Sequence, residues 1–193
     1  SAFAASTLAL SASSRSTAPA ARNLVEVFEA QARARASRAA VKHKKDGAWQ
    51  EVSWTELARR ARDVSDGLAA MGVQPGDRVA ILGETNLEWI VADLGLLGAG
   101  AIAVTIYQSN KAHECQYILQ DSGARFVFCG DESQVAKIRE AKAQLPQLEG
   151  IIRATGSARD GLERTLADLM GKDASARYRF ITERAREADN LDV

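Results

Sequence analysis

The 193-residue chain is 46% hydrophobic and 26% charged, which is typical of one globular domain with a substantial core and excludes a wholly disordered chain. Its 25 Lys and Arg residues balance 25 Asp and Glu residues, so no overall positive field exists to attract nucleic acid. The two cysteines, Cys115 and Cys129, form neither a CxxC motif nor a metal-binding pattern, and no apolar run reaches the roughly 20 residues that span a bilayer. We therefore expect a cytoplasmic protein with reduced thiols, no metal ligands and no nucleic-acid partner.

Residues 1–21 are rich in small and hydroxyl side chains, and we expect a disordered leader or an expression remnant there; a weak secretory signal is the alternative. Beyond them, apolar residues at helical spacing predict an amphipathic helix over residues 24–36, with Asn23 as its N-cap. Asp46-Gly47 then lies between two short alternating segments. That dipeptide is a strong signal for a β-hairpin.

The stretch that opens with Ser53 and Glu56 in capping-box spacing carries one apolar stripe and ends at Gly72, which predicts a helix. The short apolar run "RVAILG" follows and is typical of a buried parallel strand. Helical and strand patterns then alternate as far as "GIIRAT", which indicates βαβ units. The predicted fold is α/β: a doubly wound parallel sheet flanked by helices, preceded by an N-terminal helix and a β-hairpin.

We expect this α/β subdomain to cover residues 22–159. From Asp160 the pattern changes to apolar stripes at helical spacing without an evident strand. Residues 160–193 are therefore predicted to form a helical segment.

Ligands of doubly wound sheets bind outside the carboxyl ends of the strands, so the predicted strand-to-helix loops are the candidate sites. "GETNLE" lacks the glycines of a phosphate loop, and the spacing of Thr85 and Glu88 favours a helix cap over a ligand site. In "VTIYQSNKAHE", Asn110 is a reasonable N-cap for a helix that starts at Lys111. A cation at a helix N-terminus opposes the macrodipole, so Lys111 indicates either an anionic ligand or a nearby carboxylate.

Other candidates have simpler structural interpretations. His113 and Cys115 form neither a metal pattern nor a nucleophile with an orienting group, and Cys129 is expected to be a small buried hydrophobe. Lys137 and Arg139 in "VAKIREAK" fit a solvated helix face, with phosphate contact as the alternative. The basic residues between 33 and 45 are not interleaved with stacking aromatics, which favours a solvated surface over RNA binding.

Three segments in order, "SWTELARRA", "GVQPGDRVAIL" and "LLGAGAIAVTIYQSNKAHECQYILQDSGARFVF", resemble the N-terminal part of adenylate-forming enzymes, specifically long-chain fatty acyl-CoA synthetases. The resemblance covers residues 22–193. It implies a parent enzyme that forms an acyl-adenylate from a fatty acid and ATP with Mg²⁺ and then transfers the acyl group to CoA. The family's Ser/Thr/Gly-rich phosphate loop ending in Pro-Lys-Gly does not occur in these 193 residues.

The resemblance therefore implies an AMP-forming ligase fragment that is inactive alone and has no catalytic residue of its own. Its implied partners are fatty acid, CoA and the remainder of the synthetase, with peripheral contact to the inner face of the membrane and self-association of the fragment as further expectations. A stand-alone, non-catalytic α/β module that binds a nucleotide, an acyl chain or a protein is the alternative.

Within the resemblance, the residues expected to border the substrate cleft are Tyr107, Gln108, Ser109, Asn110 and Lys111. Lys137 and Arg139 lie in the region where some relatives place cations near the 3′-phosphate of CoA. Many relatives carry proline where this chain has Thr105 and Gln108, so the resemblance does not extend to the proline-restricted backbone of those relatives.

Overall fold

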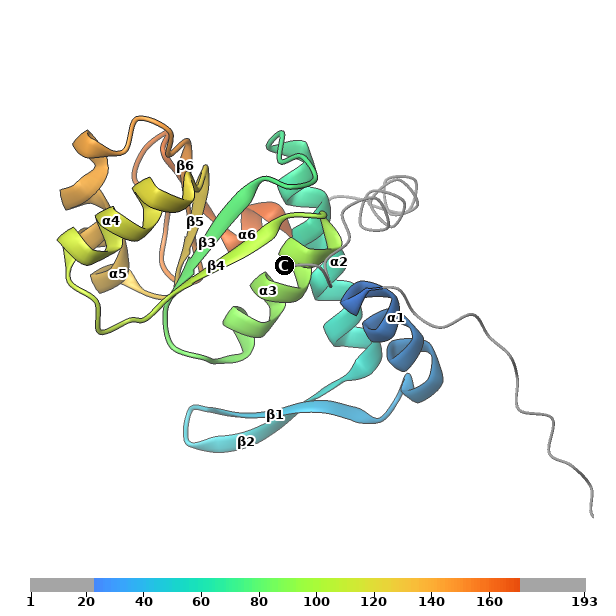
Figure 1. Cartoon of the computed structure of the whole chain (residues 1–193). Helices are drawn as coiled ribbons and strands as arrows, with labels where there is room; N and C mark the ends of the chain where they lie inside the picture. Colours follow the sequence, from blue (N-terminus) through green and yellow to red (C-terminus); the bar gives the residue numbers. More distant parts are fainter. Residues whose placement is uncertain (1–22, 171–193) are drawn as a thin grey trace, which may run out of the picture.

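A five-stranded parallel sheet with strand order β4-β3-β5-β6-β7 forms the centre of the computed structural model, which describes residues 23–170 (Figure 1). The strands are β3 (Arg78–Leu82), β4 (Ile102–Ile106), β5 (Phe126–Cys129), β6 (Gly150–Arg153) and β7 (Glu163–Thr165). β3 pairs with β4 on one side and with β5 on the other. The strand order therefore reverses at β3: β4 lies on one side of it, and the later strands follow one another on the other side.

Helices cover both faces of this sheet, and alternate strand residues face the two layers. Val79 and Ile81 of β3 pack into one apolar cluster with α2 (Trp54–Ala70), α3 (Leu87–Gly98) and the short α6 (Leu166–Leu169). Ala80 and Leu82 pack into a second cluster with α4 (Ala112–Ser122) and α5 (Glu132–Ala141). The predicted doubly wound fold is confirmed.

The N-terminal helix and hairpin are also confirmed. Asn23 caps α1 (Leu24–Arg35) by accepting the backbone N–H of Glu26 at 3.0 Å. β1 (Ala39–Lys45) and β2 (Ala48–Ser53) form an antiparallel pair. Asp46 (φ 51°) and Gly47 (φ 80°) both adopt the left-handed conformation that a two-residue hairpin turn requires.

The predicted helix starts need small corrections. Ser53 caps α2 as expected, but Asn86 rather than Thr85 caps α3, accepting the backbone N–H of Trp89 at 2.9 Å. α4 begins at Ala112, so Lys111 rather than Asn110 occupies its N-cap position. A 3₁₀ turn, η1 (Lys142–Gln144), extends α5.

The segment after Asp160 differs from the helical prediction. Residues Glu163–Thr165 form β7, which pairs in parallel with β6, and only the one-turn helix α6 follows before the described residues end. The strand was missed because its three residues are polar and its first is a buried carboxylate. The predicted leader, residues 1–21, and the rest of the predicted helical segment, residues 171–193, lie outside the described residues. No helix within residues 23–170 combines the length and the apolar character needed to cross a bilayer.

The buried carboxylate of Glu163 attaches β7 to the rest of the sheet. Its side chain is 0% exposed and accepts hydrogen bonds from Arg139 Nε at 2.7 Å, Arg153 Nη1 at 2.8 Å and the backbone N–H of Arg159 at 3.0 Å. Burial alone would raise the pKa of Glu163, but the hydrogen bonds from Arg153 and Arg139 outweigh it and hold the pKa below its ordinary value. A polar edge strand is thus held by ion pairs.

We expect Glu163→Gln to destabilise the fold by about 3–5 kcal/mol at pH 7, because it removes the buried carboxylate that Arg153 and Arg139 share and leaves them only the exposed Glu132 and Asp160 as carboxylate partners. The folded-state pKa of Glu163 is depressed below 4.5, so its stabilisation is complete above that pH and is lost as the pH falls through the folded pKa. Urea unfolding at pH 7 and in acid measures the free energy of unfolding. The variant and wild type should converge in acid, whereas a deficit of the same size at every pH would contradict this account.

The exposed Glu140 of α5 provides the control. Glu140→Gln removes one carboxylate from the same helix without touching the buried network. Its free energy of unfolding should stay within about 0.5 kcal/mol of wild type at both pH values.

Candidate functional site

The carboxyl ends of β3, β4 and β5 lie at one edge of the sheet because the strands are parallel. The loops that leave this edge cover residues 83–86, 107–111 and 130–131. The chain reverses across the sheet at β3, so this edge is the position at which doubly wound folds bind ligands.

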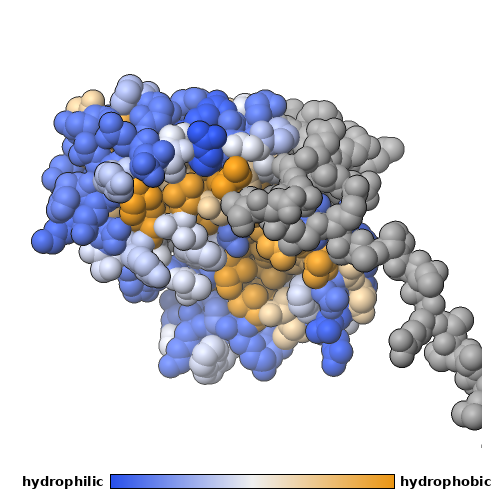
Figure 2. Space-filling view, in the orientation of Figure 1, coloured by the Kyte–Doolittle hydropathy of each residue, from blue (hydrophilic) through white to orange (hydrophobic). Residues whose placement is uncertain are grey.

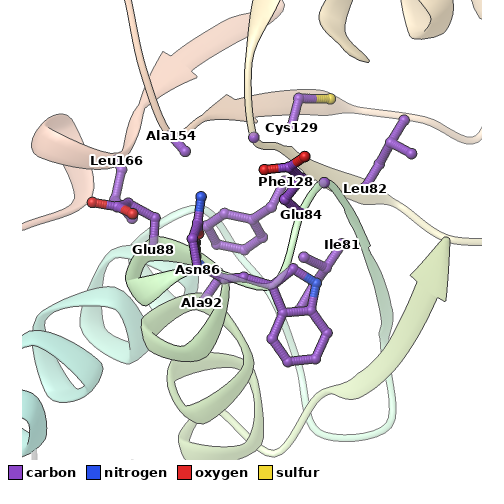
Figure 3. A pocket seen from close by; sticks show the side chains of 13 residues that line it. Ile81, Leu82, Glu84, Asn86, Glu88, Ala92, Phe128, Cys129, Ala154 and Leu166 are labelled. Carbon is purple, nitrogen blue, oxygen red and sulfur yellow. Dashed lines mark hydrogen bonds between the residues drawn. The ribbon is translucent and has the colours of Figure 1, made fainter. Parts of the chain in front are cut away.

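A small pocket opens between the ends of β3 and β5 and the start of α3 (Figure 3). Apolar side chains such as Ile81, Phe128 and Leu166 line its base, and Glu84 and Asn86 add polar groups. Its volume of about 20 Å³ accommodates a single water molecule. This pocket is therefore too small for a nucleotide.

Two glycines bring the loops after β3 and β5 into backbone contact. A Cβ atom on Gly83 would lie 3.2 Å from Cα and 3.3 Å from N of Gly130, closer than nine in ten real Cβ contacts. The backbone N–H of Gly130 also donates to the carbonyl oxygen of Leu82 at 2.9 Å. The sequence contains this signal, because each strand of the pair is followed at once by glycine.

The loop after β4 is connected to the loop after β3 and to helix α5. Gln108 Nε2 donates to the carboxylate of Glu84 at 3.0 Å. Lys137 Nζ, from α5, donates to the backbone oxygen of Gln108 at 2.5 Å and to Gln134 Oε1 at 3.0 Å. Sequence reasoning missed Glu84, because "GETNLE" was weighed on the spacing of Thr85 and Glu88, which favoured a helix cap over a ligand site.

The predicted cleft residues form a tight, exposed turn. Tyr107 is 82% exposed, Gln108 and Ser109 are exposed, and the N–H of Asn110 donates to the carbonyl oxygen of Tyr107 at 3.0 Å. The backbone N–H of Lys111 donates to the carboxylate of Glu114 at 2.7 Å. This carboxylate offsets the unfavourable cation at the start of α4.

Lys137 and Arg139 point to different parts of the molecule. Lys137 reaches the loop after β4, whereas Arg139 binds Glu163 and, at 2.9 Å, Asp160. The structure therefore brings Lys137 together with the predicted cleft residues and leaves Arg139 in the ion-pair network of β7.

The remaining candidates show no activated chemistry. Burial raises the pKa of the Cys115 and Cys129 thiols, which disfavours a reactive thiolate, and His113 is exposed. Within residues 23–170, no three His, Cys, Asp or Glu side chains are grouped closely enough to hold a metal ion.

Comparison with known proteins gives consistent matches. Residues 28–189 match the model of a family described as AMP-binding enzyme. The long-chain-fatty-acid–CoA ligase FadD15 of Mycobacterium bovis is 35% identical over 119 residues, which cover 62% of this chain and 20% of that protein. The human long-chain-fatty-acid–CoA ligase ACSBG1 is 30% identical over 109 residues, which cover 56% of this chain and 15% of that protein. The chain thus spans about a fifth or less of the curated relatives it matches.

A solved structure agrees with these matches. The anthranilate CoA ligase AuaEII in complex with anthranoyl-AMP superposes with a TM-score of 0.70 at 28% identity, covering 79% of this chain and 28% of that one.

We expect Gly83→Ala to destabilise the protein by about 1–3 kcal/mol, because the new methyl group meets backbone atoms of Gly130 that cannot rotate away. Gly161→Ala is the matched control, since a Cβ atom there meets nothing within 4 Å, and it should change stability by no more than about 1 kcal/mol. Chemical denaturation of both variants measures the difference. Equal stabilities would show that the backbone contact between the two loops does not constrain this edge.

Proposed function

This chain belongs to the family of AMP-binding enzymes, and we propose that it forms the N-terminal part of an AMP-forming long-chain-fatty-acid–CoA ligase. The family match over residues 28–189, which include the whole sheet and its candidate edge, carries the proposal. In the proposed reaction, a fatty acid and ATP give an acyl-adenylate and pyrophosphate. CoA then attacks the acyl carbon through its thiol, so that a thioester forms and AMP leaves.

ATP, Mg²⁺ and CoA are the cofactors of the proposed reaction. The pocket at the sheet edge does not fit them alone, because it holds about 20 Å³ and no Pro-Lys-Gly phosphate loop occurs in the 193 residues. Stabilising the charge on the transferred groups needs positioned backbone donors and cations around the phosphates. We therefore assign no chemical step to this part of the polypeptide and propose that it is inactive alone.

The proposed contribution of this part is one wall of the acyl or CoA cleft, formed by residues Tyr107–Lys111. The exposed ring of Tyr107 can pack on an apolar chain while its hydroxyl stays hydrated. Lys111 adds a cation at the same turn. For contact with the CoA phosphate, the position of Lys137 at this edge is more favourable than that of Arg139, which already binds two carboxylates.

The remainder of the ligase is the proposed partner of the surface formed by β4 and α3. β4 is an edge strand with half-buried residues, and the half-buried Ile90 and Leu94 project from α3 beside it. Hydrophobic side chains gather over these elements on the face shown in Figure 2. The same surface would support self-association of the isolated chain. Peripheral contact with the membrane also belongs to the proposal, because a long-chain acid partitions into bilayers.

Acid-dependent exchange of pyrophosphate into ATP tests the proposed function. The complete polypeptide that contains this sequence should exchange label with a long-chain fatty acid, and exchange should fall at least tenfold with acetate or without acid. The 193-residue chain should show no exchange above the protein-free control. Exchange by the 193-residue chain would overturn the proposal that it is inactive alone. Exchange by the complete polypeptide that does not depend on a long-chain acid would overturn the proposed substrate.

A further inference from the structure

Gln108 is held at two points by two different elements. Its side chain donates to Glu84 in the loop after β3, and its backbone oxygen accepts a hydrogen bond from Lys137 of α5, the helix that follows β5. Gln108, in the loop after β4, thereby connects the loop after β3 with helix α5.

Lys137, the donor from α5, lies in a well-anchored part of that helix. Asp131 caps α5 by accepting the backbone N–H groups of Ser133 and Gln134 at 2.8 and 3.2 Å, and the side chain of Gln134 is buried. Lys137 lies one turn further along this helix, is half-buried and also binds Gln134 Oε1. Its ammonium group is therefore confined before it reaches Gln108.

The loop that receives these contacts has little other support. Tyr107 and Ser109 are exposed on either side of Gln108, and no proline lies between Thr105 and Lys111 to restrict the backbone. One turn hydrogen bond, from Asn110 N–H to the Tyr107 carbonyl oxygen, closes it locally, and at its far end the Lys111 N–H donates to the Glu114 carboxylate. The shape of residues 107–109 should thus depend on the two contacts of Gln108.

We propose that Glu84 and Lys137 are positioning residues that hold Gln108, and through it residues 107–111, in the shape that the substrate meets at this edge. The identity of the substrate in this inference rests on the proposed function. The claim that the two contacts keep the loop ordered does not. Lys137 thereby has a role other than binding phosphate. The two partners of its ammonium group described above are neutral oxygens, those of Gln108 and Gln134.

Amide hydrogen exchange of the 193-residue chain tests the positioning directly. Lys137→Met and Glu84→Ala each remove one contact of an exposed residue, and we expect amides of residues 107–111 to exchange about 5- to 10-fold faster in each variant. Lys137→Arg retains a donor and Glu84→Gln retains an acceptor oxygen, so both should stay near wild type. Unchanged exchange in the Lys137→Met and Glu84→Ala variants would overturn the proposal.

Two controls separate a local effect from misfolding. Glu140→Gln changes an exposed carboxylate on α5 and should leave residues 107–111 unchanged. Amides of β3 and β5 should be equally protected in every variant. If Lys137→Met or Glu84→Ala loses this protection, Gln108→Glu decides instead. This variant keeps the backbone acceptor but places a second carboxylate beside Glu84. Faster exchange confined to residues 107–111 would support the contact, and unchanged exchange would overturn it.

Steady-state kinetics of the complete polypeptide test what the loop meets. Lys137→Met should raise KM for fatty acid or CoA about tenfold with kcat within about twofold of wild type, and Lys137→Arg should restore KM. Faster loop exchange with unchanged KM would overturn the substrate role of the loop. A raised KM for CoA without faster loop exchange would overturn positioning in favour of direct phosphate contact. Absence of any acid-dependent reaction in wild type would instead refute the proposed function, while the exchange experiment would still decide the loop's order.

Discussion

Burial of β3 and β5 on both faces is the constraint on which the rest of this structure depends. Residues 79–82 and 126–129 are almost completely buried, and their side chains alternate between the two apolar clusters. Neither strand could be covered by a single helical layer, so the fold needs α2 and α3 on one side and α4 and α5 on the other. Each helix is connected to the sheet through loops, and three of these loops leave at the same edge.

The loops that follow β3 and β5 approach each other closely, because the two strands lie side by side in the sheet. Gly83 and Gly130 let the two loops meet backbone to backbone, which leaves only a small pocket between them. The more exposed loop after β4 then donates a hydrogen bond to Glu84 in the loop after β3 and accepts one from Lys137 of α5. The edge is thus an ordered surface with an exposed aromatic ring, and it is suited to forming one wall of a cleft that other parts of a ligase complete.

Most of the fold could be predicted because its signals are local. Alternation of short apolar runs with helical stripes gave the parallel sheet, and Asp46-Gly47 gave the hairpin turn. β7 was missed because its burial depends on Glu163, whose charge is balanced by Arg139 and Arg153 from distant positions. Gln108 lies 24 residues after Glu84 and 29 residues before Lys137, so the three residues that form this link are far apart in the sequence. No local pattern encodes such a link.

Photoaffinity labelling tests most directly whether this edge borders the substrate. The complete polypeptide would be irradiated with a photoreactive long-chain fatty acid in the presence of ATP, and the labelled peptides would be identified by mass spectrometry. The account predicts label within residues 107–111, reduced by an excess of the unmodified acid. Label that is competed by the unmodified acid but is confined to other parts of the polypeptide, with none in residues 104–114, would contradict it.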